Sequence, residues 1–156
     1  MSYSVESIEG YAIKRREKPV VVKNRYEFCK VGIVGCGILG QEITRMVSSH
    51  GIEVTFVEIS EEKIEQALLS ISNDLDDMIE KWGMTYSEKK AIMSRIQGTM
   101  NYEDLEGSEI VIESVKSRSR ESSVDLRKRI FKEVEANIAP DAIIATNSTT
   151  LVITEM

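Results

Sequence analysis

Six consecutive residues, Gly35-Cys36-Gly37-Ile38-Leu39-Gly40, have the types and spacing of a loop that binds phosphate groups. An apolar segment at 31–34 precedes this glycine loop, and a segment with helical spacing of apolar residues follows it. The first glycine permits a tight turn, the second lets a phosphate approach bare backbone, and the third allows a helix to pack closely on a strand. The loop therefore predicts a phosphorylated ligand at the N-terminus of a helix.

An acidic residue, Glu58, follows the next apolar segment, Val54 to Val57. A carboxylate at this place can accept hydrogen bonds from both hydroxyls of an adenosine ribose, and it repels a 2′-phosphate. The next two residues, Ile59 and Ser60, supply no arginine for such a phosphate. We therefore expect a dinucleotide, NAD rather than NADP. S-adenosylmethionine enzymes share the loop and the acid, so that cofactor stays open, although the third glycine favours the dinucleotide.

Strand-like and helix-like segments alternate around these residues. Strands are expected at 30–34, 54–58, 110–112 and 142–146, with a short edge segment near Thr99-Met100. The helix after the glycine loop is expected to bury four apolar residues, Leu39, Ile43, Met46 and Val47. A long helix from 61 to Gly83 and a shorter one from Ser87 to Gly98, with Ile92 and Ile96 facing inward, form a hairpin at 61–97. This order predicts an α/β, Rossmann-type, doubly wound parallel sheet with a long helical hairpin inserted after strand 2.

A last helix carries an apolar stripe and ends before Pro140. The stripe consists of Leu126, Ile130, Phe131, Val134 and Ile138. We divide the chain into an N-terminal extension, residues 1–28, and one nucleotide-binding domain, residues 29–156.

The composition is that of an ordinary globular domain. The chain has 156 residues, 42% of them hydrophobic and 29% charged, with a net charge of −6. We expect no nucleic-acid partner, no membrane span, no secretion signal and no metal site. The two cysteines, Cys29 and Cys36, are expected to be free thiols, and the location to be cytoplasmic.

Four segments together resemble the 3-hydroxyacyl-CoA dehydrogenase family, over about residues 29–156. They are Lys30-Val-Gly-Ile-Val-Gly-Cys-Gly-Ile-Leu-Gly40, Val57-Glu-Ile-Ser60, Val111-Ile-Glu-Ser-Val115 and Ala145-Thr-Asn-Ser-Thr-Thr-Leu151. The resemblance implies an NAD-binding domain whose oversized helical hairpin contributes to CoA binding. It also implies acyl-CoA as substrate and a homodimer for the full-length parent.

The resemblance assigns roles to individual positions. It implies pyrophosphate contacts from Gly35 to Gly40, Cys36, Ile38 and Leu39 included, and adenosine ribose binding by Glu58. It places Glu113 and Asn147 at the cofactor, Thr149 at the nicotinamide and substrate, and Lys81 near the CoA phosphates, although a solvated lysine at a helix end is an equal alternative.

The chain departs from the family pattern after Val115. Relatives have a second glutamate near the nicotinamide, but here Lys116 and Ser117 follow. Glu121 and Arg127 are candidates to replace that glutamate and its neighbouring lysine. The alternative interpretation is that the polar stretch at 116–123 is a solvated loop without a role in binding.

The family reaction oxidises the 3-hydroxyl of an acyl-CoA to a 3-keto group by hydride transfer to NAD, and a histidine paired with a glutamate removes the proton. Relatives carry that pair in a helical domain beyond the Asn-Thr-Ser-Ser segment, so we expect this chain alone to be inactive. Its one histidine, His50, fits the end of a helix and is not a plausible base. Two alternatives stay open: a non-catalytic NAD(H)-binding module, and another hydroxy acid dehydrogenase with the same first domain.

Overall fold

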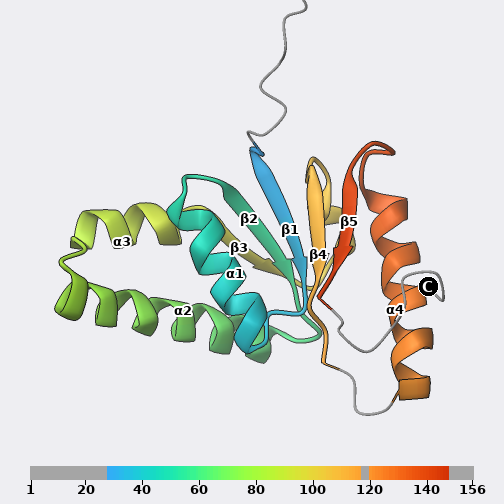
Figure 1. Ribbon diagram of the computed structural model, residues 1–156, viewed down its shortest axis with the longest axis horizontal. Helices are drawn as coiled ribbons and strands as arrows, with labels where there is room; N and C mark the ends of the chain where they lie inside the picture. Colours follow the sequence, from blue (N-terminus) through green and yellow to red (C-terminus); the bar gives the residue numbers. More distant parts are fainter. Residues whose placement is uncertain (1–27, 117–119, 148–156) are drawn as a thin grey trace, which may run out of the picture.

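A parallel sheet forms the centre of the computed structural model, which describes residues 28–116 and 120–147 (Figure 1). Within those residues the strand order is β3-β2-β1-β4-β5, and every neighbouring pair runs parallel. The strands are β1 (Lys30–Val34), β2 (Glu53–Val57), β3 (Ile96–Thr99), β4 (Ile110–Glu113) and β5 (Ile143–Thr146). The strand order reverses between β1 and β4, which is the switch point of a doubly wound fold. The predicted Rossmann-type sheet is confirmed.

Helices cover both faces of the sheet. They are α1 (Ile38–Ser49), α2 (Glu61–Trp82), α3 (Tyr86–Met93), the 3₁₀ helix η1 (Tyr102–Leu105) and α4 (Arg120–Asn137). One apolar core lies between the sheet and α2, around Phe56, Ile71 and Leu75, with Phe28 packed at its edge. The other lies between the sheet, η1 and α4, around Leu105 and Val134. Parallel strands need such cover on both faces because their backbones are buried.

The segment between β2 and β3 is a hairpin of two helices. Ser60 caps α2 by accepting a hydrogen bond from the Lys63 amide, and Gly83 ends it in the left-handed conformation with φ 75°. Helix α3 begins with a capping box in which Thr85 and Glu88 bond to each other's backbone. These bonds lower the pKa of the Glu88 carboxyl. In Figure 1 the hairpin projects sideways from the sheet.

The predicted end of the second helix is wrong, because Ile96 to Thr99 form the edge strand β3. Gly98 lies inside this strand and does not end a helix. A Cβ on Gly98 would lie 2.4 Å from Ile64 Cγ2 and 2.6 Å from Phe56 Cζ. The glycine therefore makes room for α2 to pack on the sheet.

The buried face of α1 also differs from the prediction. Met46 is 53% exposed and Leu39 is 42% exposed, whereas Gly40, Thr44 and Ser48 are buried. Small residues face the sheet because α1 lies very close to β1. Ile43 and Val47 do pack against the core as expected.

The last helix keeps its predicted stripe, and its apolar residues pack in the second core. It begins at Arg120, so residues 120–123, which the loop prediction included, are helical. In the part of the chain that the structure describes, no helix is long and apolar enough to cross a membrane.

Candidate coenzyme site

The predicted site residues gather where the parallel strands end. The glycine loop follows β1, Glu58 follows β2, Ser114 follows β4 and Asn147 follows β5. The carboxyl ends of these strands meet at one edge of the sheet, at the lower side of Figure 1. Ligands of doubly wound folds bind in the crevice at this edge, beside the switch point.

Each glycine of the loop has a distinct structural reason. Gly35 has φ 89°, which favours glycine, and its amide donates to the Val57 carbonyl at 3.0 Å. A Cβ on Gly40 would lie 2.3 Å from the Gly35 carbonyl oxygen, so only glycine allows α1 to pack this closely. A Cβ on Gly37 would meet no atom within 4 Å. Gly37 therefore faces open space, where a ligand can approach the backbone.

The side chain of Cys36 points into the core and not into the site. It is buried, and its sulfur lies 3.8 Å from Thr44 Oγ1. Burial raises the pKa of the thiol to about 12, against the weaker effect of the Thr44 hydrogen bond. Cys36 thus serves the site through its backbone amide, which donates to Glu58.

The carboxylate of Glu58 lies against the glycine loop. Its Oε1 accepts a hydrogen bond from the Cys36 amide at 2.7 Å, and its Oε2 accepts one from the Ile59 amide at 3.1 Å. Each oxygen keeps a lone pair for a further donor, such as a ribose hydroxyl. Nearby, burial and the charges of Glu133 and Glu58 raise the pKa of the Tyr102 phenol, which stays neutral.

Two cavities meet at the glycine loop. The first, which we call the Glu58 cavity, has a volume of about 550 Å³ and is lined by Glu58, Tyr102 and Ile130 among others. The second, the Asn147 cavity, has a volume of about 520 Å³ and includes Leu39 and Asn147. Because both are lined by Gly37, they adjoin at the loop, and this arrangement suits a ligand with two halves joined by phosphates.

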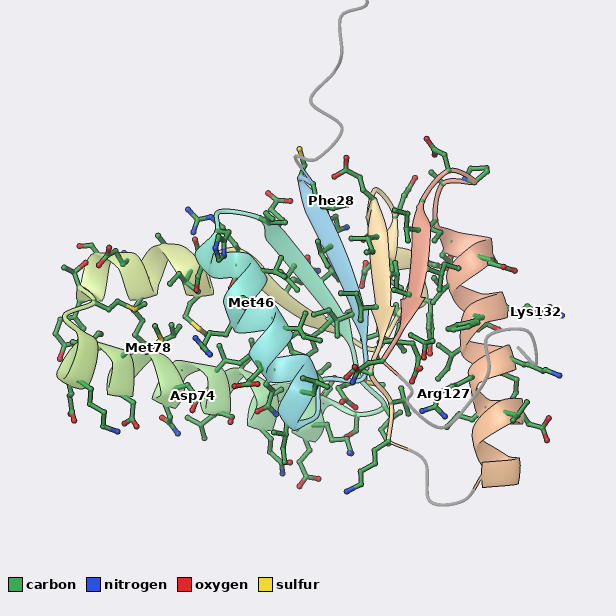
Figure 2. The ribbon with its side chains drawn as sticks, in the orientation of Figure 1. Phe28, Met46, Asp74, Met78, Arg127 and Lys132 are labelled. Atoms are coloured by element: carbon green, nitrogen blue, oxygen red, sulfur yellow. The ribbon has the colours of Figure 1, made fainter. Side chains whose placement is uncertain are left out.

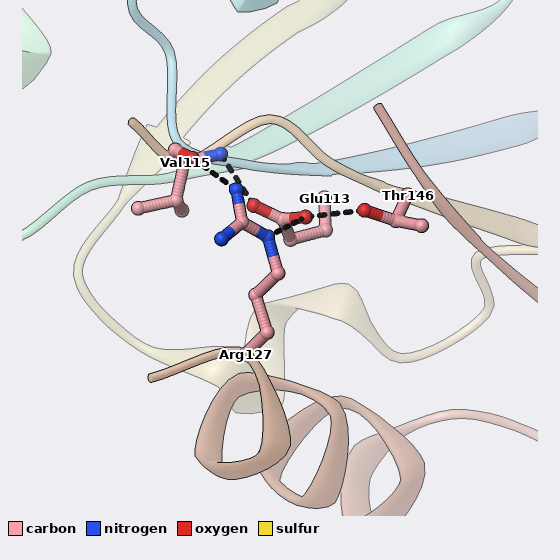
Figure 3. A network of polar contacts seen from close by, with 4 residues as sticks. All are labelled: Glu113, Val115, Arg127 and Thr146. Atoms are coloured by element: carbon pink, nitrogen blue, oxygen red, sulfur yellow. Dashed lines mark hydrogen bonds and ion pairs between the residues drawn. The ribbon is translucent and has the colours of Figure 1, made fainter. Parts of the chain in front are cut away.

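A buried ion pair forms one wall of the Asn147 cavity (Figure 3). Glu113 Oε2 accepts from Arg127 Nε at 2.9 Å and from Thr146 Oγ1 at 2.6 Å, and Glu113 Oε1 accepts from the Val115 amide at 2.7 Å. The guanidinium also donates from Nη2 to the Val115 carbonyl at 3.0 Å. These bonds tie the ends of β4 and β5 to α4.

Comparison with known proteins fits this geometry. Residues 30–156 match the family model described as the NAD-binding domain of 3-hydroxyacyl-CoA dehydrogenase. The chain belongs to this family. Its cofactor is NAD, and the bare backbone at Gly37 and the carboxylate at Glu58 fit that molecule.

Relatives of this dehydrogenase domain agree. A fatty acid oxidation complex subunit alpha from Psychrobacter sp. (strain PRwf-1) is 30% identical over 132 residues, which cover 85% of this chain and 18% of that protein. A 3-hydroxybutyryl-CoA dehydrogenase from Bradyrhizobium diazoefficiens is 26% identical over 127 residues, which cover 81% of this chain and 42% of that protein. The chain thus spans less than half the length of these relatives.

Two solved structures of longer chains contain the same fold. The (S)-3-hydroxybutyryl-CoA dehydrogenase from Ralstonia eutropha is 30% identical with a TM-score of 0.75, covering 83% of this chain and 44% of that chain. FadB2 of M. tuberculosis is 26% identical with a TM-score of 0.76, and the match covers 82% of this chain and 44% of that chain.

Four other positions of this dehydrogenase domain were candidates from the sequence. Arg127 lies at the Asn147 cavity, but its guanidinium is paired with Glu113. The Glu121 side chain and all of Thr149 lie outside the described residues, so their roles stay predictions. Lys81 is exposed on the hairpin and forms an ion pair with Asp77 at 2.6 Å, which raises the pKa of the lysine.

His50 lies at the opposite end of α1 from the glycine loop, as expected. Its Nδ1 is 2.8 Å from the Met46 carbonyl oxygen, within hydrogen-bond distance.

The sequence departs from the family pattern after Val115, as expected, and the residue found there, Lys116, lines both cavities. Sequence reasoning gave no binding role to Lys116 or to Lys63, although the position of Lys63, five residues after Glu58, was a usable signal.

Proposed function

We propose that this chain is the coenzyme-binding part of an NAD-dependent 3-hydroxyacyl-CoA dehydrogenase of the 3-hydroxybutyryl-CoA type. The observation that carries the proposal is the pair of cavities on either side of Gly37, one with the Glu58 carboxylate and the other with Asn147. The adenosine ribose would bind at Glu58, the pyrophosphate at the glycine loop, and the nicotinamide half in the Asn147 cavity. Relatives with dehydrogenase activity support this assignment.

The proposed reaction converts the 3-hydroxyl of an acyl-CoA to a ketone. NAD supplies the chemistry by accepting a hydride. The residues of this chain bind and orient the dinucleotide, and the apolar walls of the Asn147 cavity, Ile38 and Leu39, limit water around its nicotinamide half. His50 lies too far from the site to take the hydroxyl proton, so we expect a second, helical domain to supply the base.

The acyl-CoA contact of Lys81 stays part of the proposal. Helix α2 begins beside Glu58 and carries Lys81 about 20 residues later, which is roughly 30 Å along the helix axis. An extended ligand such as CoA is long enough to reach along this hairpin, whereas the nicotinamide pocket is not within reach of the lysine. The ammonium would have to leave Asp77 to bind a phosphate.

Binding of NADH to the wild-type chain and to Gly37→Val tests the cofactor site. Gly37 has φ −72° and faces open space, so valine is tolerated by the backbone and meets no neighbouring atom. The new side chain occupies the place of the phosphate and removes one or two charge-assisted hydrogen bonds, which weakens binding by about 10-fold to 1000-fold. Equal affinity of the two folded proteins in calorimetry contradicts the proposed site.

A second experiment tests the reaction. The helical domain of a related dehydrogenase is added to this chain, and NADH formation from 3-hydroxybutyryl-CoA is followed by absorbance. Turnover that requires both parts supports the dehydrogenase. Tight NADH binding without turnover favours a non-catalytic NAD(H)-binding module. The observation that supports this alternative is the sequence after Val115, where Lys116 and Ser117 stand in place of the family glutamate.

A further inference from the structure

The junction between the two cavities contains two lysines. Five residues line both the Glu58 cavity and the Asn147 cavity: Gly37, Lys63, Ser114, Val115 and Lys116. Lys63 comes from the first turn of α2, and Lys116 follows β4. The two lysines therefore come to the lining shared with Gly37 from different elements.

Neither ammonium group has a hydrogen-bond or ion-pair partner among residues 28–116 and 120–147. Elsewhere in the described chain, Lys30 donates to two backbone carbonyls, and Lys81 and Lys89 pair with carboxylates, whereas Lys90, Lys128 and Lys132 resemble Lys63 and Lys116 in forming no ion pair there. The charged residues that line the two cavities are Lys63, Lys116 and Arg127 against Glu58 and Glu113, which gives this lining a net charge of +1 in a chain with a net charge of −6.

Helix stability does not explain Lys63. The N-terminus of a helix carries a partial positive charge, so a lysine in the first turn opposes the dipole, whereas the neighbouring Glu61 and Glu62 favour it. The side chain is exposed and fills no core space. Neither the helix dipole nor core packing therefore accounts for a lysine at this place in the cavity lining.

We propose that Lys63 and Lys116 bind the pyrophosphate of the dinucleotide from the side opposite the glycine loop. The inference rests on the proposed function, because it places the pyrophosphate at the junction of the two cavities. Backbone amides of α1 face the phosphates from one side, and the two ammonium groups act as mobile point charges from the other. A 2′-phosphate is not the target, because the ribose that carries it would lie at Glu58, outside the shared junction.

The test measures NADH and ADP-ribose affinity for the wild-type chain, Lys63→Gln, Lys116→Gln and the double variant. Lys132→Gln is the matched control, because Lys132 is exposed on α4 and points away from the sheet (Figure 2). Each site substitution is expected to weaken both ligands by about threefold to tenfold at an ionic strength of about 0.01 M. At about 1 M, where charges are screened within roughly 3 Å, the differences should largely disappear.

ADP-ribose keeps the pyrophosphate and lacks the nicotinamide, so equal losses for both ligands support the proposal. Unchanged affinity in the double variant, with NADH bound normally by the wild type, overturns this inference and leaves the proposed function intact. NADPH is titrated against the same variants, and a loss confined to NADPH also overturns the inference, because the lysines would then bind a 2′-phosphate. No NADH binding by the folded wild type overturns the proposed function itself.

Discussion

Replacing Glu113 by glutamine should strongly destabilise the fold. The carboxylate is 1% exposed and its partner Arg127 is 6% exposed, so neither charge has water to compensate for the loss of the other. Both carboxylate oxygens accept hydrogen bonds, from Arg127 and Thr146 on one and from the Val115 amide on the other. Glutamine keeps the shape but has only one acceptor oxygen, so its amide nitrogen faces a donor.

The expected cost follows from the burial of the arginine. Removing one partner of a buried pair leaves an uncompensated charge and costs about 3–5 kcal/mol. A domain of this size has a total stability of about 5–15 kcal/mol, and each kcal/mol changes Tm by roughly 2–4 °C. We therefore expect Tm to fall by about 6–20 °C.

Thermal and urea unfolding of Glu113→Gln, Arg127→Met and the double variant Glu113→Leu/Arg127→Met measures this effect. The double variant should recover most of the lost stability, because apolar residues of similar size remove both charges together. Glu135→Gln is the control. Glu135 is exposed on α4, the helix that carries Arg127, so this substitution should change the stability by less than about 0.5 kcal/mol. A Glu113→Gln protein that melts with the control refutes the reasoning.

Three further predictions concern the loop and its surroundings. Glu58→Ala should weaken NADH binding by about 10-fold to 100-fold and NADPH binding much less, because the lost hydrogen bonds serve the ribose and the lost charge repels the 2′-phosphate; equal losses in calorimetry contradict this. Gly40→Ala should destabilise the fold by about 1–3 kcal/mol, because its Cβ would lie 2.3 Å from the Gly35 carbonyl oxygen; an unchanged urea midpoint argues against it. At pH 9 iodoacetamide should modify exposed Cys29 and spare Cys36, whose pKa burial raises from 9.0 to about 12; peptide mass analysis decides, and early labelling of Cys36 in folded protein counts against the burial argument. The pKa of the Cys36 thiol is higher in the folded protein than in the unfolded chain. Burial of the neutral thiol therefore contributes a constant amount to the free energy of unfolding below about pH 9, and this contribution is lost as pH rises toward 12.

The elements with strong local signals were predictable. β1, the glycine loop and α2 combine a hydrophobic period with turn or cap residues, and the structure contains them at nearly the expected positions. β3 was placed too late along the chain, as a short edge segment near Thr99-Met100, because Gln97 and Gly98 give no strand signal. Only the packing of Ile64 and Phe56 shows why a glycine is needed there.

The site was predictable only where its residues are close in sequence. Glu58 and the glycine loop follow from one βαβ unit. The bonds of Glu113 to Arg127 and Thr146 join residues 14 and 33 positions apart, and no local pattern specifies them. The exposed Met46 shows the same limit, since helical spacing gives a face but the close approach of α1 to the sheet decides which residues fill it.

Side-chain burial decreases along α2, from the sheet toward the tip of the projecting hairpin. Burial within α2 is complete at Ala67, Ile71 and Leu75 and only partial at Met78, where no strand lies beneath the helix. Its outer half packs on α3 and is joined to α1 by the hydrogen bond from Arg45 Nη1 to Met78 Sδ at 3.3 Å, so hydrogen exchange of backbone amides should become faster toward Gly83. The end of α2 beside Glu58 is thus anchored on the sheet by fully buried side chains, whereas the distal end of the hairpin has fewer buried side chains to resist displacement.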